Sequence, residues 1–128
     1  MITLQPLRWG KPYESIELKD IVHFDTGEPI AKFGTVGGGI VGRDMKKAHK
    51  AREALLRHST SELIEMSKQA AVLFESAELP VGDSMQSVDQ FVHQQSASTG
   101  LPEHMCRSNM KKNSFVLSNI DQILECLT

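Results

Sequence analysis

Apolar residues in the first third of the chain alternate with polar ones around a single turn signal. The turn reads Asp25-Thr26-Gly27-Glu28, and period-two alternation on both sides of such a turn predicts a β-hairpin. Pro29 follows directly and suits the first residue of an edge strand, because proline cannot donate to the ladder. We therefore expect a hairpin with an exposed edge. The apolar members of the pattern are Ile16, Leu18, Val22, Phe24, Ile30 and Phe33.

A glycine-rich stretch follows at residues 34–42, and we interpret it as a flexible joint. Glycine offers a strand no side chain to pack and loses the most conformational entropy on folding. Gly37, Gly39 and Gly42 also match the G-x-G-x-x-G fingerprint of dinucleotide-binding loops. That fold needs a buried hydrophobic strand before the glycines and a second strand with an acidic end after the helix, and the sequence predicts neither. Phosphate binding here is an alternative to a plain hinge.

Apolar residues recur at helical spacing after the joint. Asp44 can cap a first helix that reaches Leu55. Ser59 and Glu62 fit a capping box, which opens a second helix that ends where Pro80 breaks the pattern. The face of the first helix consists of Met45, Ala48, Ala51, Arg52 and Leu55. The stripe of the second, which we interpret as core or as a partner interface, consists of Leu63, Met66, Ala70, Leu73, Phe74 and Ala77.

Two more helices are predicted before residue 118. The third starts at Asp83 or Ser84 and ends within the small-residue run 96–100. Pro102 suits the first residue of the fourth, because its missing amide hydrogen would lack a partner there. The inward residues of the third helix are Met85, Val88, Phe91 and Val92.

A final helix can begin at Ser118, and it reaches Thr128 without a C-cap, which we interpret as a cut rather than a natural end. Its apolar face consists of Ile120, Ile123, Leu124 and Leu127. The elements together predict an α+β fold that is mostly α-helical, with an N-terminal β-hairpin followed by four to five helices. We divide it into a hairpin and glycine-rich joint at 1–43 and a helical region at 44–128.

Composition narrows the class of protein. The chain has 128 residues, 40% of them hydrophobic and 23% charged, which suits one small folded unit. Its net charge of -2 gives no basic excess to recruit nucleic acid or anionic lipid. The sequence has neither a secretory leader nor an apolar run of membrane-spanning length, so we expect a cytoplasmic chain. Two cysteines, Cys106 and Cys126, are too few for a disulfide framework, and we expect reduced thiols.

Candidate catalytic groups are sparse. Cys106 lies near His104 and Arg107, which could favour a thiolate, but helix positions two apart do not face each other. We expect Cys106 to be a buried, inert thiol rather than a nucleophile. The glutamates Glu62, Glu65, Glu75 and Glu78 and the histidines His23, His49, His58, His93 and His104 show no acid–base or metal-ligand spacing. No catalytic, cofactor-binding or metal-binding residue is therefore predicted.

The order of features from residue 10 to residue 80 resembles the beginning of the aldehyde dehydrogenase superfamily. That family starts with a hairpin whose turn contains Thr-Gly-Glu, which stands here at residues 26–28 and is followed by Pro29. A short valine-containing link then leads to a capped, alanine-rich helix, matched by Val36, by Asp44 as the cap and by residues 48–55. The next helix begins with Glu-Leu after an arginine; here these are Arg57 and Glu62-Leu63, with Ala70-Ala71 further on.

The resemblance implies an N-terminal fragment of a larger α/β enzyme that oxidises an aldehyde with NAD or NADP to an acid or an acyl-CoA. The family's catalytic cysteine, general-base glutamate, oxyanion asparagine and ribose-contacting lysine all lie later in the chain, so none is carried over. This segment would be a scaffold that binds no cofactor. Its partners would be the remainder of the parent enzyme and further copies in a homo-oligomer. The alternative is a free-standing helical module that binds a protein partner.

Overall fold

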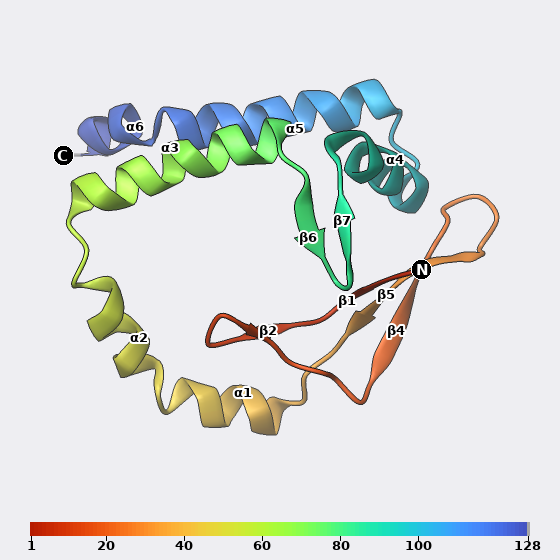
Figure 1. Ribbon diagram of the computed structural model, residues 1–128, viewed down its shortest axis with the longest axis horizontal. Coiled ribbons are helices and arrows are strands. Elements are labelled where there is room, and N and C mark those ends of the chain that lie inside the picture. Colours follow the sequence, from red (N-terminus) through yellow and green to blue (C-terminus); the bar gives the residue numbers. More distant parts are fainter. Residues whose placement is uncertain (128) are drawn as a thin grey trace.

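The computed structural model describes residues 1–127, and it confirms an α+β fold in which helices predominate (Figure 1). The strands are β1 (Ile2–Leu4), β2 (Leu7–Arg8), β3 (Lys11–Pro12), β4 (Leu18–Val22), β5 (Pro29–Gly34), β6 (Leu79–Val81) and β7 (Ser84–Gln86). The helices are α1 (Gly38–Met45), α2 (Ala48–Leu55), α3 (Thr60–Ser76), α4 (Val88–Thr99), α5 (Glu103–Ser118) and α6 (Ile120–Leu127).

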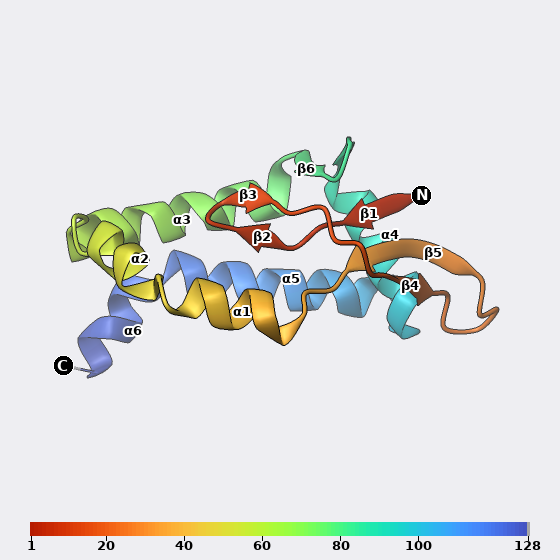
Figure 2. The same cartoon turned by 90° about the horizontal axis from the view of Figure 1, so that it is seen from below.

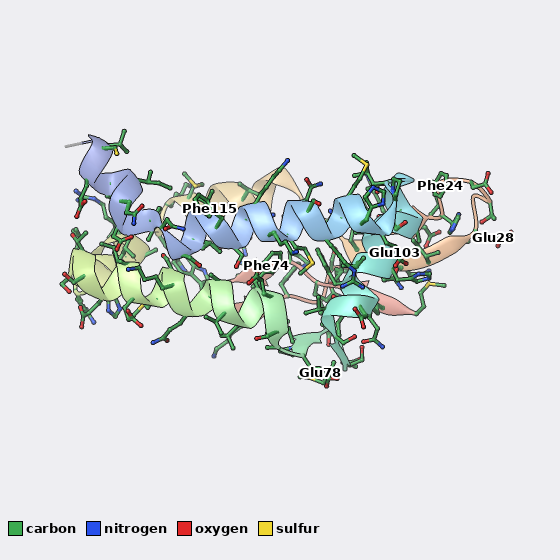
Figure 3. The ribbon with its side chains drawn as sticks, turned by 90° about the horizontal axis from the view of Figure 1, so that it is seen from above. Phe24, Glu28, Phe74, Glu78, Glu103 and Phe115 are labelled. Atoms are coloured by element: carbon green, nitrogen blue, oxygen red, sulfur yellow. The ribbon has the colours of Figure 1, made fainter. Side chains whose placement is uncertain are left out.

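The predicted hairpin is present as β4 and β5, which pair in antiparallel fashion. Its turn is closed by hydrogen bonds from Gly27 N to His23 O (2.9 Å) and from His23 N to Glu28 O (2.8 Å). Gly27 has φ +73°, a left-handed conformation that glycine adopts without steric cost. Phe24 and Glu28 mark this turn at one end of the molecule in Figure 3.

The prediction that Pro29 opens an edge strand was wrong, because β5 is the central strand of a three-stranded sheet with the order β1-β5-β4. β1 runs parallel to β5, and their pairing begins at Ile2 opposite Ala31. Pro29 is nevertheless the first residue of β5 and precedes this pairing, so its missing amide removes no bond to β1. β1 has only three residues, which is too short for alternation to predict a strand.

The core lies where α4 meets the long pair α3 and α5, which run side by side in opposite directions (Figures 1 and 2). Val92 and Cys106 are fully buried there, and Met110 is nearly so. Phe74, labelled in Figure 3, packs against this cluster and meets Phe91 edge to face, with ring centroids 6.0 Å apart. α4 also packs against β4 and β5, so the sheet and the helices share one body.

The capping box at Ser59 is confirmed. Glu62 N donates to Ser59 Oγ (3.2 Å), and Ser59 N donates to Glu62 Oε2 (2.6 Å). The apolar stripe of this helix is only partly inward, because Phe74 packs against the core whereas Met66 and Leu73 are about half exposed. The buried residue of the helix is Ala71, which lies outside the predicted stripe. α3 packs mainly against α5, with smaller contacts to α6 and α4, and these neighbours cover only part of the broad stripe predicted from the sequence.

The predicted first residues of two helices were wrong. α1 begins at Gly38, so residues 38–42 are helical rather than a joint, and Asp44 lies in the last turn instead of at the cap. The third predicted helix begins at Val88 with Ser87 as its cap, not at Asp83 or Ser84. Residues 79–86 instead form the β6–β7 hairpin around Gly82, whose φ is +59°. Met85, expected inward, lies on this hairpin and is exposed.

Two further boundaries shift slightly. Pro102 is the N-cap of α5 rather than its first residue. α4 ends at Thr99, within the predicted run 96–100, and Gly100 is its C-cap in the left-handed conformation. α5 continues through Ser118, so the last helix begins at Ile120 rather than at Ser118. The uncapped end expected at Thr128 lies outside the described residues.

Candidate interaction surface

Residues 37–58, which we call the arm, form the most exposed part of the described chain. The arm contains α1 and α2, neither of which has a buried residue, and every residue from 45 to 62 is exposed. Figure 1 shows the arm as an arc that leaves the sheet after β5 and returns to the start of α3. Isolated helices shorter than about 12–15 residues are marginal in water, so these eight-residue helices lack the tertiary packing that normally stabilises such elements.

Both helices of the arm are amphipathic. Val41 and Met45 are four residues apart on α1, and Ala48, Ala51 and Leu55 recur at spacings of three and four on α2, so each set shares one helix face. Met45 and Leu55 are more than half exposed. Apolar faces of this kind are normally covered by another element of the same or a different molecule.

The arm is also strongly basic. Residues 43–58 hold six of the fourteen Lys and Arg residues but only two of the sixteen Asp and Glu residues, so this stretch carries a net charge of +4 and the rest of the chain -6. The basic residues are Arg43, Lys46, Lys47, Lys50, Arg52 and Arg57. The overall charge of -2 therefore conceals two regions of opposite sign, and the arm presents apolar side chains among cations.

A polar cluster anchors the arm to the β2–β3 hairpin. Arg8 donates from Nε to Asp44 Oδ2 and from Nη2 to Asp44 Oδ1, each over 2.7 Å. The guanidinium also lies over the ring of Tyr13, 4.9 Å from its centroid. Hydrogen bonds from Arg8 hold the pKa of Asp44 below its ordinary value, and a bond with the Trp9 side chain acts in the same direction. This bidentate geometry fixes the orientation of α1 relative to the hairpin.

Trp9 and Gly10 form the two-residue turn of that hairpin. Their φ values are +55° and +77°, as a type I′ turn requires at both central positions. Trp9 is the only non-glycine residue with positive φ among residues 1–127. A bulky residue adopts this conformation only where the surroundings determine it, and here the turn places Arg8 and Trp9 together against Asp44.

The glycine fingerprint lies at the start of the arm. Gly37 is the N-cap of α1, and Gly39 and Gly42 are helical. A Cβ atom at any of the three would meet nothing within 4 Å. In a dinucleotide-binding unit the glycines permit close packing of helix against strand, but α1 has no buried residue and is followed by α2 rather than by a strand. The spacing of the glycines therefore matches the dinucleotide-binding fingerprint, whereas the secondary structure and packing around them differ from those of a dinucleotide-binding unit.

The two cysteines and the groups near Cys106 lie outside the arm. Cys106 is fully buried, as expected, and its Sγ lies 3.7 Å from Leu101 O, while His104 is exposed. Arg107 is engaged by Asp89 at 2.7 Å rather than by the thiol. Cys126 is exposed, and neither cysteine is in a disulfide.

The histidines and acidic residues of the described chain form no group of three that could hold a metal ion. His23 Nδ1 accepts from the backbone amides of Asp25 and Thr26, and His93 Nδ1 lies 3.2 Å from Glu103 Oε1.

None of the helices in residues 1–127 has the length and apolarity to cross a bilayer.

Comparison of the chain with protein-family models, with curated proteins and with solved structures finds no match.

Proposed function

We propose that this chain is a non-catalytic scaffold segment of an NAD(P)-dependent aldehyde dehydrogenase, and that the arm docks it onto the catalytic part of that enzyme. The catalytic part would supply the reactive thiolate and bind NAD or NADP, and the chain described here would supply binding surface. The parent reaction is the oxidation of an aldehyde to an acid or an acyl-CoA.

The exposed arm is the observation that carries the docking role. Two short amphipathic helices without a buried residue gain stability only when another surface covers them. The choice of partner rests on the sequence resemblance alone, which is carried by the Thr26-Gly27-Glu28 turn and the Glu62-Leu63 helix start.

The chemistry of the arm defines the surface that it would contact. Cations surround Met45 and Leu55, so the complementary surface is an apolar patch bordered by carboxylates. The remainder of a second copy carries net negative charge, which supports a homo-oligomer as part of the assembly.

Reading the gene past the codon for Thr128 and assaying the full product tests the proposal. We expect several hundred further residues with alternating strands and helices, one cysteine in a glycine-flanked loop, and aldehyde-dependent formation of NADH or NADPH. A stop codon at that point, together with no such activity, would overturn it and leave the free-standing interaction module as the better explanation of the arm.

Variants of the arm test the docking role separately. Leu55→Asp should weaken assembly of the full product, as measured by sedimentation, because it places a charge on the apolar face of α2. Val72→Asp is the matched control, since Val72 is also exposed but lies on α3 outside the arm. Equal effects of the two substitutions would contradict a specific role for the arm.

A further inference from the structure

Part of the apolar stripe on α3 remains uncovered in the folded chain. Met66, Ala70 and Leu73 recur at spacings of four and three residues, so they share one face of the helix. Ala70 is exposed, and Met66 and Leu73 are about half exposed. We call these three residues the outer stripe. An apolar helix face of this kind is normally covered by another element of the same or a different molecule.

Carboxylates border the outer stripe. Residues 59–78 contain four glutamates and one lysine, so this segment carries a net charge of -3. The lysine, Lys68, is engaged by Asp121 of α6, with 2.6 Å between Nζ and Oδ2. Glu62 and Glu65 are exposed next to the first residue of the stripe. The outer stripe is therefore an apolar patch with an acidic border, which is the kind of surface that complements the arm.

Helix α2 of the arm has the opposite charge and a matching apolar face. Ala48, Ala51 and Leu55 form this face, and all three are exposed. Arg52 lies in the last turn of α2 and Arg57 lies just beyond it, and both are exposed. Helices can approach more closely where the contact is made by small side chains, and arginine pairs well with carboxylates. The face of α2 thus complements the outer stripe in both apolar surface and charge.

The single chain covers neither face, since α2 has no buried residue and the outer stripe is exposed. We propose that α2 of one copy packs on the outer stripe of a second copy, and that a twofold axis repeats this contact. Each copy then gives one α2 and receives another, which closes a dimer and covers both faces. The inference rests on the proposed docking role of the arm and names a second copy as the partner of α2. The apolar residues of α1, Val41 and Met45, remain available to the catalytic part.

Sedimentation of the full chain tests this contact, because no catalytic part is needed. We expect a monomer–dimer equilibrium between about 1 µM and about 1 mM, weakened by salt. Leu73→Asp should weaken the dimer by roughly tenfold or more, because it places a charge on the outer stripe. A chain that stays monomeric over this range would overturn the proposal, whether or not the reading frame continues past Thr128. A dimer without aldehyde-dependent activity of the full product would instead count against the proposed function alone.

Two charge-reversed variants distinguish this contact from a general loss of folding. The arm variant carries Arg52→Glu and Arg57→Glu. The α3 variant carries Glu65→Lys and Gln69→Lys, which leaves the Ser59 capping box in place. Each variant alone should dimerise at least roughly tenfold more weakly than the wild type, because like charges then face each other.

An equimolar mixture of the arm variant and the α3 variant should dimerise about as tightly as the wild type. Both contacts of the mixed dimer again join opposite charges, which two misfolded chains could not restore. Absence of recovery in the mixture would overturn the proposal. Lys111→Glu with Lys112→Glu is the matched control, because it changes the net charge as much as the arm variant does but lies on α5. This control should keep the dimer, and an equally weakened dimer would show that net charge alone governs the association.

Discussion

The guanidinium of Arg8 donates two hydrogen bonds of 2.7 Å each to the carboxylate of Asp44, across a sequence separation of 36 residues. The pair joins the β2–β3 hairpin to the last turn of α1. It is the ionic contact of the described chain that attaches the arm to the rest of the molecule. The contact lies at the end of α1, and α2, which follows it, has no buried residue.

Breaking this pair should loosen α1 without unfolding the core. We expect Arg8→Gln and Asp44→Asn each to speed amide hydrogen exchange in residues 38–46, because either substitution removes the bidentate contact. Exchange of the core amides around Val92 should be unchanged. The reversed pair, Arg8→Asp with Asp44→Arg, should slow exchange again, and failure of this double variant to do so would argue against a direct ionic attachment.

Acid should destabilise the fold below about pH 4. Hydrogen bonds to Arg8, Ser59 and Lys68 lower the pKa values of Asp44, Glu62 and Asp121 respectively. A carboxyl whose pKa is lowered by folding contributes its stability above the unfolded value and loses it as the pH falls through the folded value. Urea unfolding from pH 6 to pH 3 should therefore show a falling midpoint. A triple variant with Asp44→Asn, Glu62→Gln and Asp121→Asn should show a smaller fall of the urea midpoint with pH. An equal fall in the wild type and in this variant would show that these three carboxyl groups do not cause the acid sensitivity.

Truncation of a core valine should cost far more than truncation of an exposed one. Val92 is fully buried, whereas Val72 is 64% exposed. We expect Val92→Ala to lower the free energy of unfolding by about 2 kcal/mol through lost burial and a residual cavity. Val72→Ala should have little effect, and denaturant unfolding followed by circular dichroism compares the two. A similar loss of unfolding free energy in the two variants would mean that Val92 does not lie in the core.

The contribution of the α3 capping box to the free energy of unfolding should also be measurable. Ser59→Ala removes the side-chain acceptor for Glu62 N, and we expect a loss of about 1 kcal/mol in the free energy of unfolding. Ser61→Ala, two residues into the same segment, is a suitable control because no hydrogen bond to its side chain is seen in the structure. A loss in Ser61→Ala as large as that in Ser59→Ala would contradict the capping role.

Two glycines should respond to alanine with opposite signs. Gly42 is helical and a Cβ there would meet nothing within 4 Å, so Gly42→Ala should stabilise α1 by about 0.5–1 kcal/mol. Gly100 has φ +77°, and a Cβ there would lie 2.9 Å from Cδ2 of Phe24, so Gly100→Ala should lower the melting temperature. A stabilising Gly100→Ala would show that the end of α4 is not held against Phe24.

Local patterns in the sequence were sufficient for the elements whose signals are local. The Thr26-Gly27-Glu28 turn and the Ser59 capping box formed as predicted, because each depends on groups within a few residues of one another. The start of α4 was misplaced although Ser87 and Gln90 form a second capping box, a signal that was present and was missed. The basic character of the arm was equally visible, but it is hidden in the overall charge.

The tertiary structure alone decided what depends on distant residues. β1 pairs with β5, a strand distant in the sequence, and this pairing makes β5 the central strand. The three residues of β1 are too few to show an alternation that predicts a strand. Arg8 and Asp44 meet because a hairpin turn and the end of a helix lie side by side in the folded chain. The sequence by itself determined the α+β class, the main turn and the best helix start, because hydrophobic period and backbone capping act locally. The sheet order and the anchored arm arise from packing between segments that no local period encodes.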